Sequence, residues 1–101
     1  MLRVLPEVEE ELGEAATWYE AKRPGLGVEL IAVIDRALEE IMEAPLSYTL
    51  WRDDRPYRRK VLARFPYVIF FRVEDQLVEI VAVSHTKRRP GYWMVRPGAG
   101  G

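Results

Sequence analysis

The strongest constraint on the fold is a change in hydrophobic period near residue 57. Residues 57–65, 67–73 and 77–85 are short runs rich in β-branched and aromatic residues, which is typical of strands. Upstream of residue 48, apolar residues recur every three to four positions instead, which indicates helices. We therefore expect a helical half followed by a sheet-forming half.

Two helices are predicted in the first half. The first covers residues 6–23, where Pro6 occupies a tolerated first-turn position and glutamates fill the early turns. The second runs from about residue 28 to residue 43 and carries a wide apolar stripe. Proline and two glycines at 24–27 break the helical pattern between them. So short a break predicts an antiparallel helical hairpin.

The polar residues at 74–76 predict a tight turn that joins the last two runs as an antiparallel hairpin. A short apolar start at residues 1–5 predicts an edge strand. The fold class is α+β, with a two-helix hairpin packed on a three- to four-stranded antiparallel sheet in the order β-α-α-β-β-β. The expected core includes Leu30, Ile34, Leu38, Ile69, Phe71, Ile80 and Ala82.

Residues 1–96 are expected to form a single domain, whereas the tail at 97–101 has no packing signal and is expected to be disordered. The chain has no cysteine, so disulfides and cysteine-based metal sites are excluded. It has one histidine and no compact carboxylate cluster, so we expect no metal and no cofactor. It also lacks an apolar run of about 20 residues and a signal-peptide core, which predicts a cytoplasmic protein.

Charge is divided unevenly along the chain. Residues 1–50 hold 4 Lys or Arg against 11 Asp or Glu, and residues 51–101 hold 11 against 5. The halves therefore carry net charges of −7 and +6, although the whole chain has a formal charge of only −1. This asymmetry suggests that the second half meets something anionic, or else that solvated acidic helices simply precede solvated basic strands.

The stretch from Val81 to Trp93 holds most of the candidate functional residues. A cut in RNA through the 2′-hydroxyl needs a base, a cation for the phosphate and an acid for the leaving oxygen. His85, Arg88 and Tyr92 could fill these three roles as catalytic residues without a metal. The candidate cations for binding a target or a phosphate are Arg58, Lys60, Arg64, Lys87 and Arg89.

A structural explanation competes with each of these assignments. A single histidine at a strand end is commonly a hydrogen-bonded structural residue, and cations at residues 58–64 could protect an exposed sheet edge. Trp93 is best explained as a cover for the end of the core. The stretch is thus a plain strand end, a nucleic-acid contact or a docking surface for a protein. We expect the convergence of cations from residues 58–64 and 85–89 to favour a functional surface.

Three segments resemble the ParE/RelE superfamily of toxins from type II toxin–antitoxin modules. "AATWYEAKRPGLG" resembles its helix-to-helix junction, "LARFPYVIFFRVEDQLVEIVAVSH" its strand hairpin, and "HTKRRPGYW" the C-terminal segment of its plasmid-stabilisation branch. Together these segments span nearly the whole chain. The resemblance implies the toxin component of such a module, which inhibits growth in bacteria.

The resemblance leaves two targets open. ParE-like members are thought to inhibit DNA gyrase by binding, whereas RelE-like members are ribosome-dependent mRNA endonucleases. The RelE-like branch carries an arginine after the aromatic residue that opens the penultimate strand, but here Tyr67 is followed by Val68. This departure favours the ParE-like branch. In either case the resemblance implies a cognate antitoxin, expected to be acidic and to fold on binding.

Overall fold

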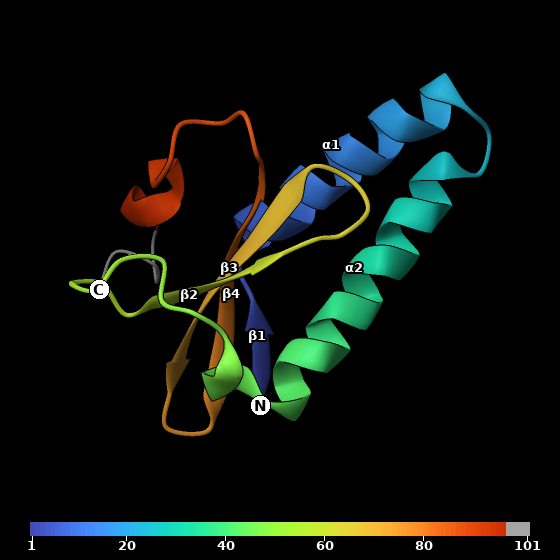
Figure 1. The fold of residues 1–101 in the computed structure, drawn as a ribbon. Coiled ribbons are helices and arrows are strands. Elements are labelled where there is room, and N and C mark those ends of the chain that lie inside the picture. Colours follow the sequence, from blue (N-terminus) through green and yellow to red (C-terminus); the bar gives the residue numbers. More distant parts are fainter. Residues whose placement is uncertain (97–101) are drawn as a thin grey trace.

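The computed structural model describes residues 1–96, and the tail at 97–101 lies outside the described residues. Its α-helices and strands are labelled in Figure 1. In chain order the elements are β1 (Leu2–Val4), α1 (Pro6–Lys22), α2 (Leu26–Glu43), the 3-10 helix η1 (Pro45–Ser47), β2 (Tyr57–Val61), β3 (Tyr67–Glu74), β4 (Leu77–His85) and the 3-10 helix η2 (Tyr92–Val95). The α+β class and the predicted order of two helices between the first strand and the last three are confirmed.

The sheet is mixed, which differs from the wholly antiparallel sheet expected from sequence. Its order is β1-β4-β3-β2. Strands β2, β3 and β4 are antiparallel neighbours, but β1 pairs in parallel with β4, with Leu2 opposite Val78 and Val4 opposite Ile80. The connection between these two strands runs through α1, α2, η1, β2 and β3, and a parallel pair requires a long connection of this kind.

Strand β2 ends at Val61, four residues before the end of the expected run at 57–65. The backbone N–H of Leu62 donates to the carbonyl of Tyr67 at 3.1 Å, which turns the chain back toward β3. Phe65 has a φ of 72°, in the left-handed region where the chain cannot continue a strand. The apolar residues at 62 and 65 therefore belong to a turn that packs on the core.

The helical hairpin depends on a close approach between α1 and α2. A Cβ built on Gly27 would lie 2.4 Å from the carbonyl oxygen of Ala16, so only glycine fits there. The carboxylate of Glu20 accepts hydrogen bonds from the backbone N–H groups of Gly25 and Gly27, at 2.7 and 2.9 Å. These bonds, that of Gly25 above all, lower the pKa of Glu20. The sequence Pro-Gly-Leu-Gly thus makes a fixed junction.

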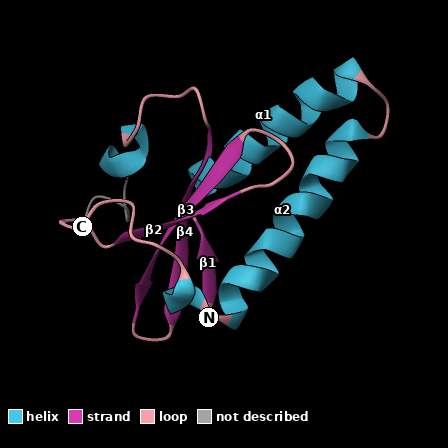
Figure 2. Ribbon diagram, viewed as in Figure 1, coloured by secondary structure: helices cyan, strands magenta, loops and turns pink. Residues whose placement is uncertain are grey.

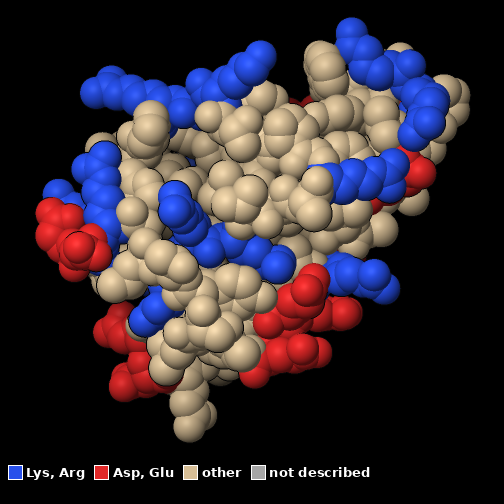
Figure 3. Space-filling view, viewed as in Figure 1, with Lys and Arg blue, Asp and Glu red and all other residues tan. Residues whose placement is uncertain are grey.

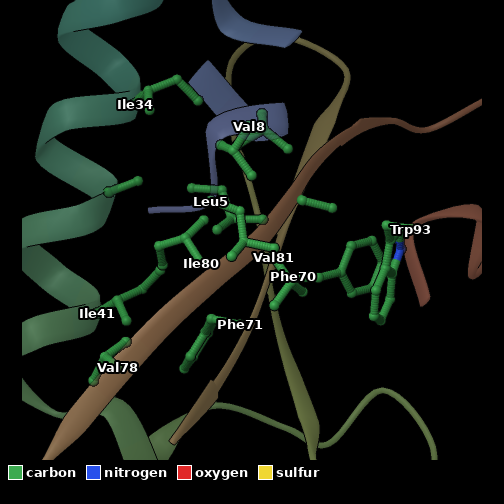
Figure 4. Packing of buried hydrophobic residues seen from close by; sticks show 14 of the residues in the cluster. Leu5, Val8, Ile34, Ile41, Phe70, Phe71, Val78, Ile80, Val81 and Trp93 are labelled. Carbon is green, nitrogen blue, oxygen red and sulfur yellow. The ribbon is translucent and has the colours of Figure 1, made fainter. Parts of the chain in front are cut away.

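The two faces of the sheet are covered by different parts of the chain. The helical hairpin lies on one side of the sheet and η2 on the other (Figure 2). The close-up in Figure 4 shows Ile34 and Ile41 of α2 facing Ile80, with Trp93 against Phe70 on the far side. The ring centroids of Trp93 and Phe70 are 4.9 Å apart and stacked.

The expected core residues are buried, except Leu38, which is half-buried against the core. Trp93 is fully buried, as the sequence predicts. Its indole Nε1 has no hydrogen-bond partner within residues 1–96.

A buried carboxylate joins three strands on the face opposite the helices. Glu79 of β4 is only 2% exposed and lies between Arg3 of β1 and Arg72 of β3 in the register of the sheet. Its carboxylate oxygens are 3.4 Å from Nε of Arg3 and 3.1 Å from Nε of Arg72. The two arginines compensate a charge that would otherwise be costly to bury, and they fix the short β1 to the sheet.

Candidate functional site

A pocket of about 240 Å³ lies where β4 ends, between α1 and the segment that leads to η2. This pocket brings together His85, Arg88 and Tyr92, the three residues proposed from sequence for catalysis. Its full lining is Glu11, Glu14, Ala15, Tyr67, Val83, His85, Arg88 and Tyr92. The pocket therefore joins the acidic first helix to the basic C-terminal segment.

Glu11 of α1 is the centre of the hydrogen bonding around this pocket. Its two carboxylate oxygens accept hydrogen bonds from the two terminal nitrogens of Arg96, at 3.0 and 2.7 Å. The hydroxyl of Tyr92 donates to Oε2, and the backbone N–H of Val83 donates to Oε1 at 3.4 Å. We call this arrangement of Glu11, Tyr92 and Arg96 the Glu11 clamp. It fastens the C-terminal segment to α1 across more than 80 positions of sequence.

The Glu11 clamp fixes the state and position of Tyr92. Burial, followed by the hydrogen bond to Glu11, raises the pKa of Tyr92, so the phenol remains protonated. The guanidinium of Arg88 lies 3.8 Å from the centre of the Tyr92 ring, and that of Arg96 lies at 5.1 Å. Arg88 is therefore held at the pocket mouth by a cation–π contact rather than by a carboxylate.

One ring nitrogen of His85 is already hydrogen-bonded to the backbone. Its Nδ1 accepts the backbone N–H of Lys87 at 3.1 Å. An imidazole nitrogen that accepts a hydrogen bond carries no proton, so the proton of neutral His85 is on Nε2. Its ring also packs edge-on against Tyr67, with 5.3 Å between centroids. Neutral His85 has no second lone pair free to act as a base.

Tyr67 forms the wall between the pocket and the helical hairpin. Its ring lies 6.4 Å from that of Tyr19 in α1, at a steep angle. Burial, with the neighbouring Tyr19 as a further cause, raises the pKa of Tyr67 to about 12. Its phenol is neutral throughout the physiological range.

The candidate cations on and after β2 lie outside this pocket. Lys60 faces Glu40 of α2 at 3.8 Å, and Arg64 donates to Glu29 of α2 at 2.8 Å. Arg58 donates to the carbonyl oxygen of Tyr48 at 2.6 Å. The structure thus directs Arg58, Lys60 and Arg64 to neighbouring backbone or to α2, and does not bring them to His85.

Lys87 and Arg89, the remaining candidate cations, are exposed in the loop between β4 and η2. Neither forms an ion pair within residues 1–96. They flank Arg88 in the chain, so this loop presents three consecutive cations, of which Arg88 lines the pocket.

Sequence reasoning missed Glu11 and Arg96. Glu11 lies among glutamates that the helix dipole alone explains, and Arg96 lies next to a tail with no packing signal. No local spacing relates residues so far apart, and only the return of the chain over the sheet brings them together. Within residues 1–96, no group of histidine and carboxylate side chains is arranged to hold a metal ion.

A second concave surface, of about 760 Å³, lies between the two helices. We call it the hairpin groove. Most of its lining side chains are small or apolar, and Val28 within it is 70% exposed. The groove is lined by Ala16, Thr17, Glu20, Ala21, Gly27, Val28, Ile31, Ala32 and Asp35.

None of the helices within residues 1–96 is long and apolar enough to cross a membrane.

A family model matches most of the chain. The family model described as "ParE toxin of type II toxin-antitoxin system, parDE" matches residues 2–90. A solved structure of the chromosomal ParDE toxin–antitoxin system from P. aeruginosa is similar in fold, with a TM-score of 0.76 at 15% sequence identity. That similarity covers 85% of this chain and 95% of the other. No curated protein matches.

Proposed function

Because this chain belongs to the ParE toxin family of type II toxin–antitoxin systems, we propose that it inhibits growth by binding DNA gyrase rather than by cutting RNA. The chain is a ParE-like toxin, as its sequence suggests. The proposed target-binding surface is the pocket mouth formed by His85, Lys87, Arg88 and Arg89. This surface is basic and exposed, and the Glu11 clamp holds it in place.

The observation that carries this proposal is the state of His85 and Tyr92. The one lone pair of neutral His85 accepts the N–H of Lys87, and the hydroxyl of Tyr92 donates to Glu11. A nuclease would need the first group to remove a proton and the second to supply one. Both groups are occupied by bonds that hold the C-terminal segment, so binding explains the geometry better than catalysis.

The alternative is a RelE-like, ribosome-dependent mRNA endonuclease. The convergence of His85, Arg88 and Tyr92 on one pocket favours it, because these groups could be rearranged when RNA binds. Brief expression in cells separates the two functions. We expect plasmid supercoiling to change before the integrity of translated mRNA does. Cleaved mRNA in cells with unchanged supercoiling would instead establish the endonuclease.

The second part of the proposal is the partner. A cognate antitoxin would lay an apolar helix into the hairpin groove, because the groove exposes apolar surface along both helices. The charged residues of the groove, Glu20 and Asp35, are acidic. An acidic antitoxin tail, as expected from sequence, would therefore have to reach beyond the groove to Lys22 and Arg23 at the hairpin tip.

A glutamate placed in the hairpin groove tests whether the antitoxin binds there. We expect Val28→Glu to abolish co-purification with the antitoxin encoded beside the toxin gene, because it places a charge against an apolar helix. Val28 is 70% exposed, so the toxin itself should still fold. Val61→Glu is the matched control, because Val61 is 61% exposed but lies on β2. Loss of the complex in both variants, or in neither, would rule out the groove.

A further inference from the structure

Six exposed cations from two separate segments surround the face of the sheet that η2 covers. None of them belongs to an ion pair within residues 1–96. One group precedes or lies on β2, and the other is the loop that follows β4. They are Arg52, Arg55, Arg59, Lys87, Arg88 and Arg89.

Trp51 joins the two segments. A Cβ built on Gly91 would lie 3.1 Å from Cη2 of Trp51, so the loop after β4 runs directly over this ring. The guanidinium of Arg52 lies 4.3 Å from the ring of Trp51. Arg52 therefore lies on the aromatic cluster of Trp51 and Trp93, and the chain reaches that cluster at Gly91, two residues after the cations at 87–89.

Arg59 lies on the same face of β2 as Tyr57, because side chains alternate along a strand. The ring of Tyr57 packs 4.7 Å from that of Trp93, which places this face under η2. Figure 3 shows Lys and Arg over much of the face in view, with Asp and Glu mostly along the lower and left edges. We call the six cations the basic face.

The charge of the basic face is only partly offset nearby. Asp53 and Asp54 lie in the same loop as Arg52 and Arg55, and both are exposed. Neither forms an ion pair within residues 1–96. Glu11 and Glu14 line the pocket with Arg88, but Glu11 is already paired with Arg96. Six cations against Asp53, Asp54 and Glu14 still leave a positive surface on a chain with a net charge of −1. Such a surface attracts a polyanion through its local field, whatever the net charge.

We propose that the basic face binds the phosphate backbone of double-stranded DNA without sequence preference. Single-stranded nucleic acid needs exposed aromatic rings on which bases stack. Trp93 is fully buried and Arg52 lies over the Trp51 ring, so within residues 1–96 neither ring offers such a platform on this face. Among the described residues the helix on this face is η2, and its four residues are too few to enter the major groove and read bases.

This inference is separate from the binding of gyrase. It concerns the purified toxin and DNA alone, and either proposal can fail while the other stands. The two surfaces share the cations at 87–89, whereas Arg52, Arg55 and Arg59 belong to the basic face alone.

Fluorescence anisotropy with a labelled DNA duplex tests the proposal directly. We expect binding that weakens steeply with salt and is the same for unrelated sequences. Each phosphate neutralised adds about 0.9 to the slope of log K against log salt, so the slope should not exceed about 5 for six cations. The triple variant Arg52→Ala/Arg55→Ala/Arg59→Ala should lower that slope by roughly 2 to 3.

The matched control is Arg36→Ala, because Arg36 is an exposed and unpaired cation of α2 within the described chain. It should leave the slope unchanged. Melting curves verify that all variants are folded. Absence of duplex binding at low salt would overturn the proposal, as would a triple variant that binds like the wild type. Tighter binding of single-stranded RNA or of an acidic peptide than of duplex DNA would also overturn it.

Discussion

At the scale of single residues, the Glu11 clamp connects the charge of the first helix to the position of the C-terminal segment. The carboxylate of Glu11 accepts hydrogen bonds from Arg96, from Tyr92 and from the backbone N–H of Val83. Both side chains of the ion pair are mostly buried, with 16% of Glu11 and 12% of Arg96 exposed. Removing one partner of a pair this sheltered costs more than breaking a surface ion pair, because it leaves the other charge desolvated.

Replacing Glu11 measures this contribution. We expect Glu11→Ala to lower the free energy of unfolding by about 2–4 kcal/mol, because Arg96 and the hydroxyl of Tyr92 lose their acceptor. Glu14→Ala is the control, since Glu14 is exposed on the same helix and its loss should cost no more than about 0.5 kcal/mol. Urea unfolding gives both values. Equal effects of the two substitutions would show that the Glu11 clamp does not hold the segment.

Tyr67 gives a prediction in alkaline solution. Its pKa is raised from an ordinary value near 10 to about 12, so the unfolded chain loses this proton at lower pH than the folded protein does. The stabilising effect is complete below pH 10 and is lost as the pH rises toward 12. Urea unfolding across this range should show a steeper loss of stability in the wild type than in Tyr67→Phe. Identical slopes would contradict the burial of the phenol.

At the scale of elements, η2 acts as the cover of the second sheet face. It places Trp93 against Phe70, Tyr57 and Trp51. The same short helix brings Tyr92 to Glu11. Packing and the clamp therefore fix the loop at 87–89 from its C-terminal side, and β4 fixes it from the other.

Two substitutions at Trp93 distinguish the effect of losing the side-chain volume from the effect of losing the indole N–H. We expect Trp93→Ala to cost about 3–5 kcal/mol in the free energy of unfolding, because it leaves a large cavity. Trp93→Phe should cost clearly less, since it keeps an aromatic ring and removes an indole N–H with no partner within the described chain. Chemical denaturation compares the two. A phenylalanine variant as unstable as the alanine variant would mean that Nε1 has a partner that stabilises it.

Sequence predicts the elements well because their signals are local. The helical stripe of residues 28–43, the turn at 74–76 and the core position of Trp93 all depend on near neighbours in the chain. The direction of β1 could not be predicted, because a three-residue edge strand pairs either way without changing its pattern. The ion-pair partners of Lys60 and Arg64 could not be predicted either, because Glu40 and Glu29 of α2 are distant from them in sequence.

The candidate site was predicted in part for the same reason. His85, Arg88 and Tyr92 lie within eight positions of one another, so the chain itself keeps them together. Glu11 and Arg96 are joined only by the tertiary fold, as are the cations at 52–59 with those at 87–89. A convergence of cations was expected from residues 58–64 and 85–89, but Arg58, Lys60 and Arg64 bind neighbouring backbone or α2 instead, so the sequence did not specify which cations come together.

At the scale of the whole molecule, different surfaces serve different proposed partners. The hairpin groove is apolar and lies between α1 and α2, whereas the basic pocket mouth lies where β4 ends. An antitoxin helix and a cellular target would therefore contact separate regions. Neutralisation would then require the antitoxin to reach across the molecule or to block the target by its bulk.

The central claim is that this ParE-like toxin acts by binding gyrase through the mouth of the pocket. Supercoiling of relaxed plasmid by purified gyrase tests it, with Arg88→Ala beside the wild type. We expect the wild type to stop supercoiling and Arg88→Ala to need about tenfold more protein or higher, as for an arginine at the centre of an interface. The melting midpoint should stay within a few degrees, because exposed charges contribute only about 0–1 kcal/mol.

Relaxation of the same plasmid by a second topoisomerase is the control, run at a salt concentration that suppresses the proposed binding of the toxin to duplex DNA, because a toxin that coats DNA would slow both enzymes. Inhibition of gyrase alone is the result we expect. Undiminished supercoiling in the presence of excess folded toxin would contradict the account.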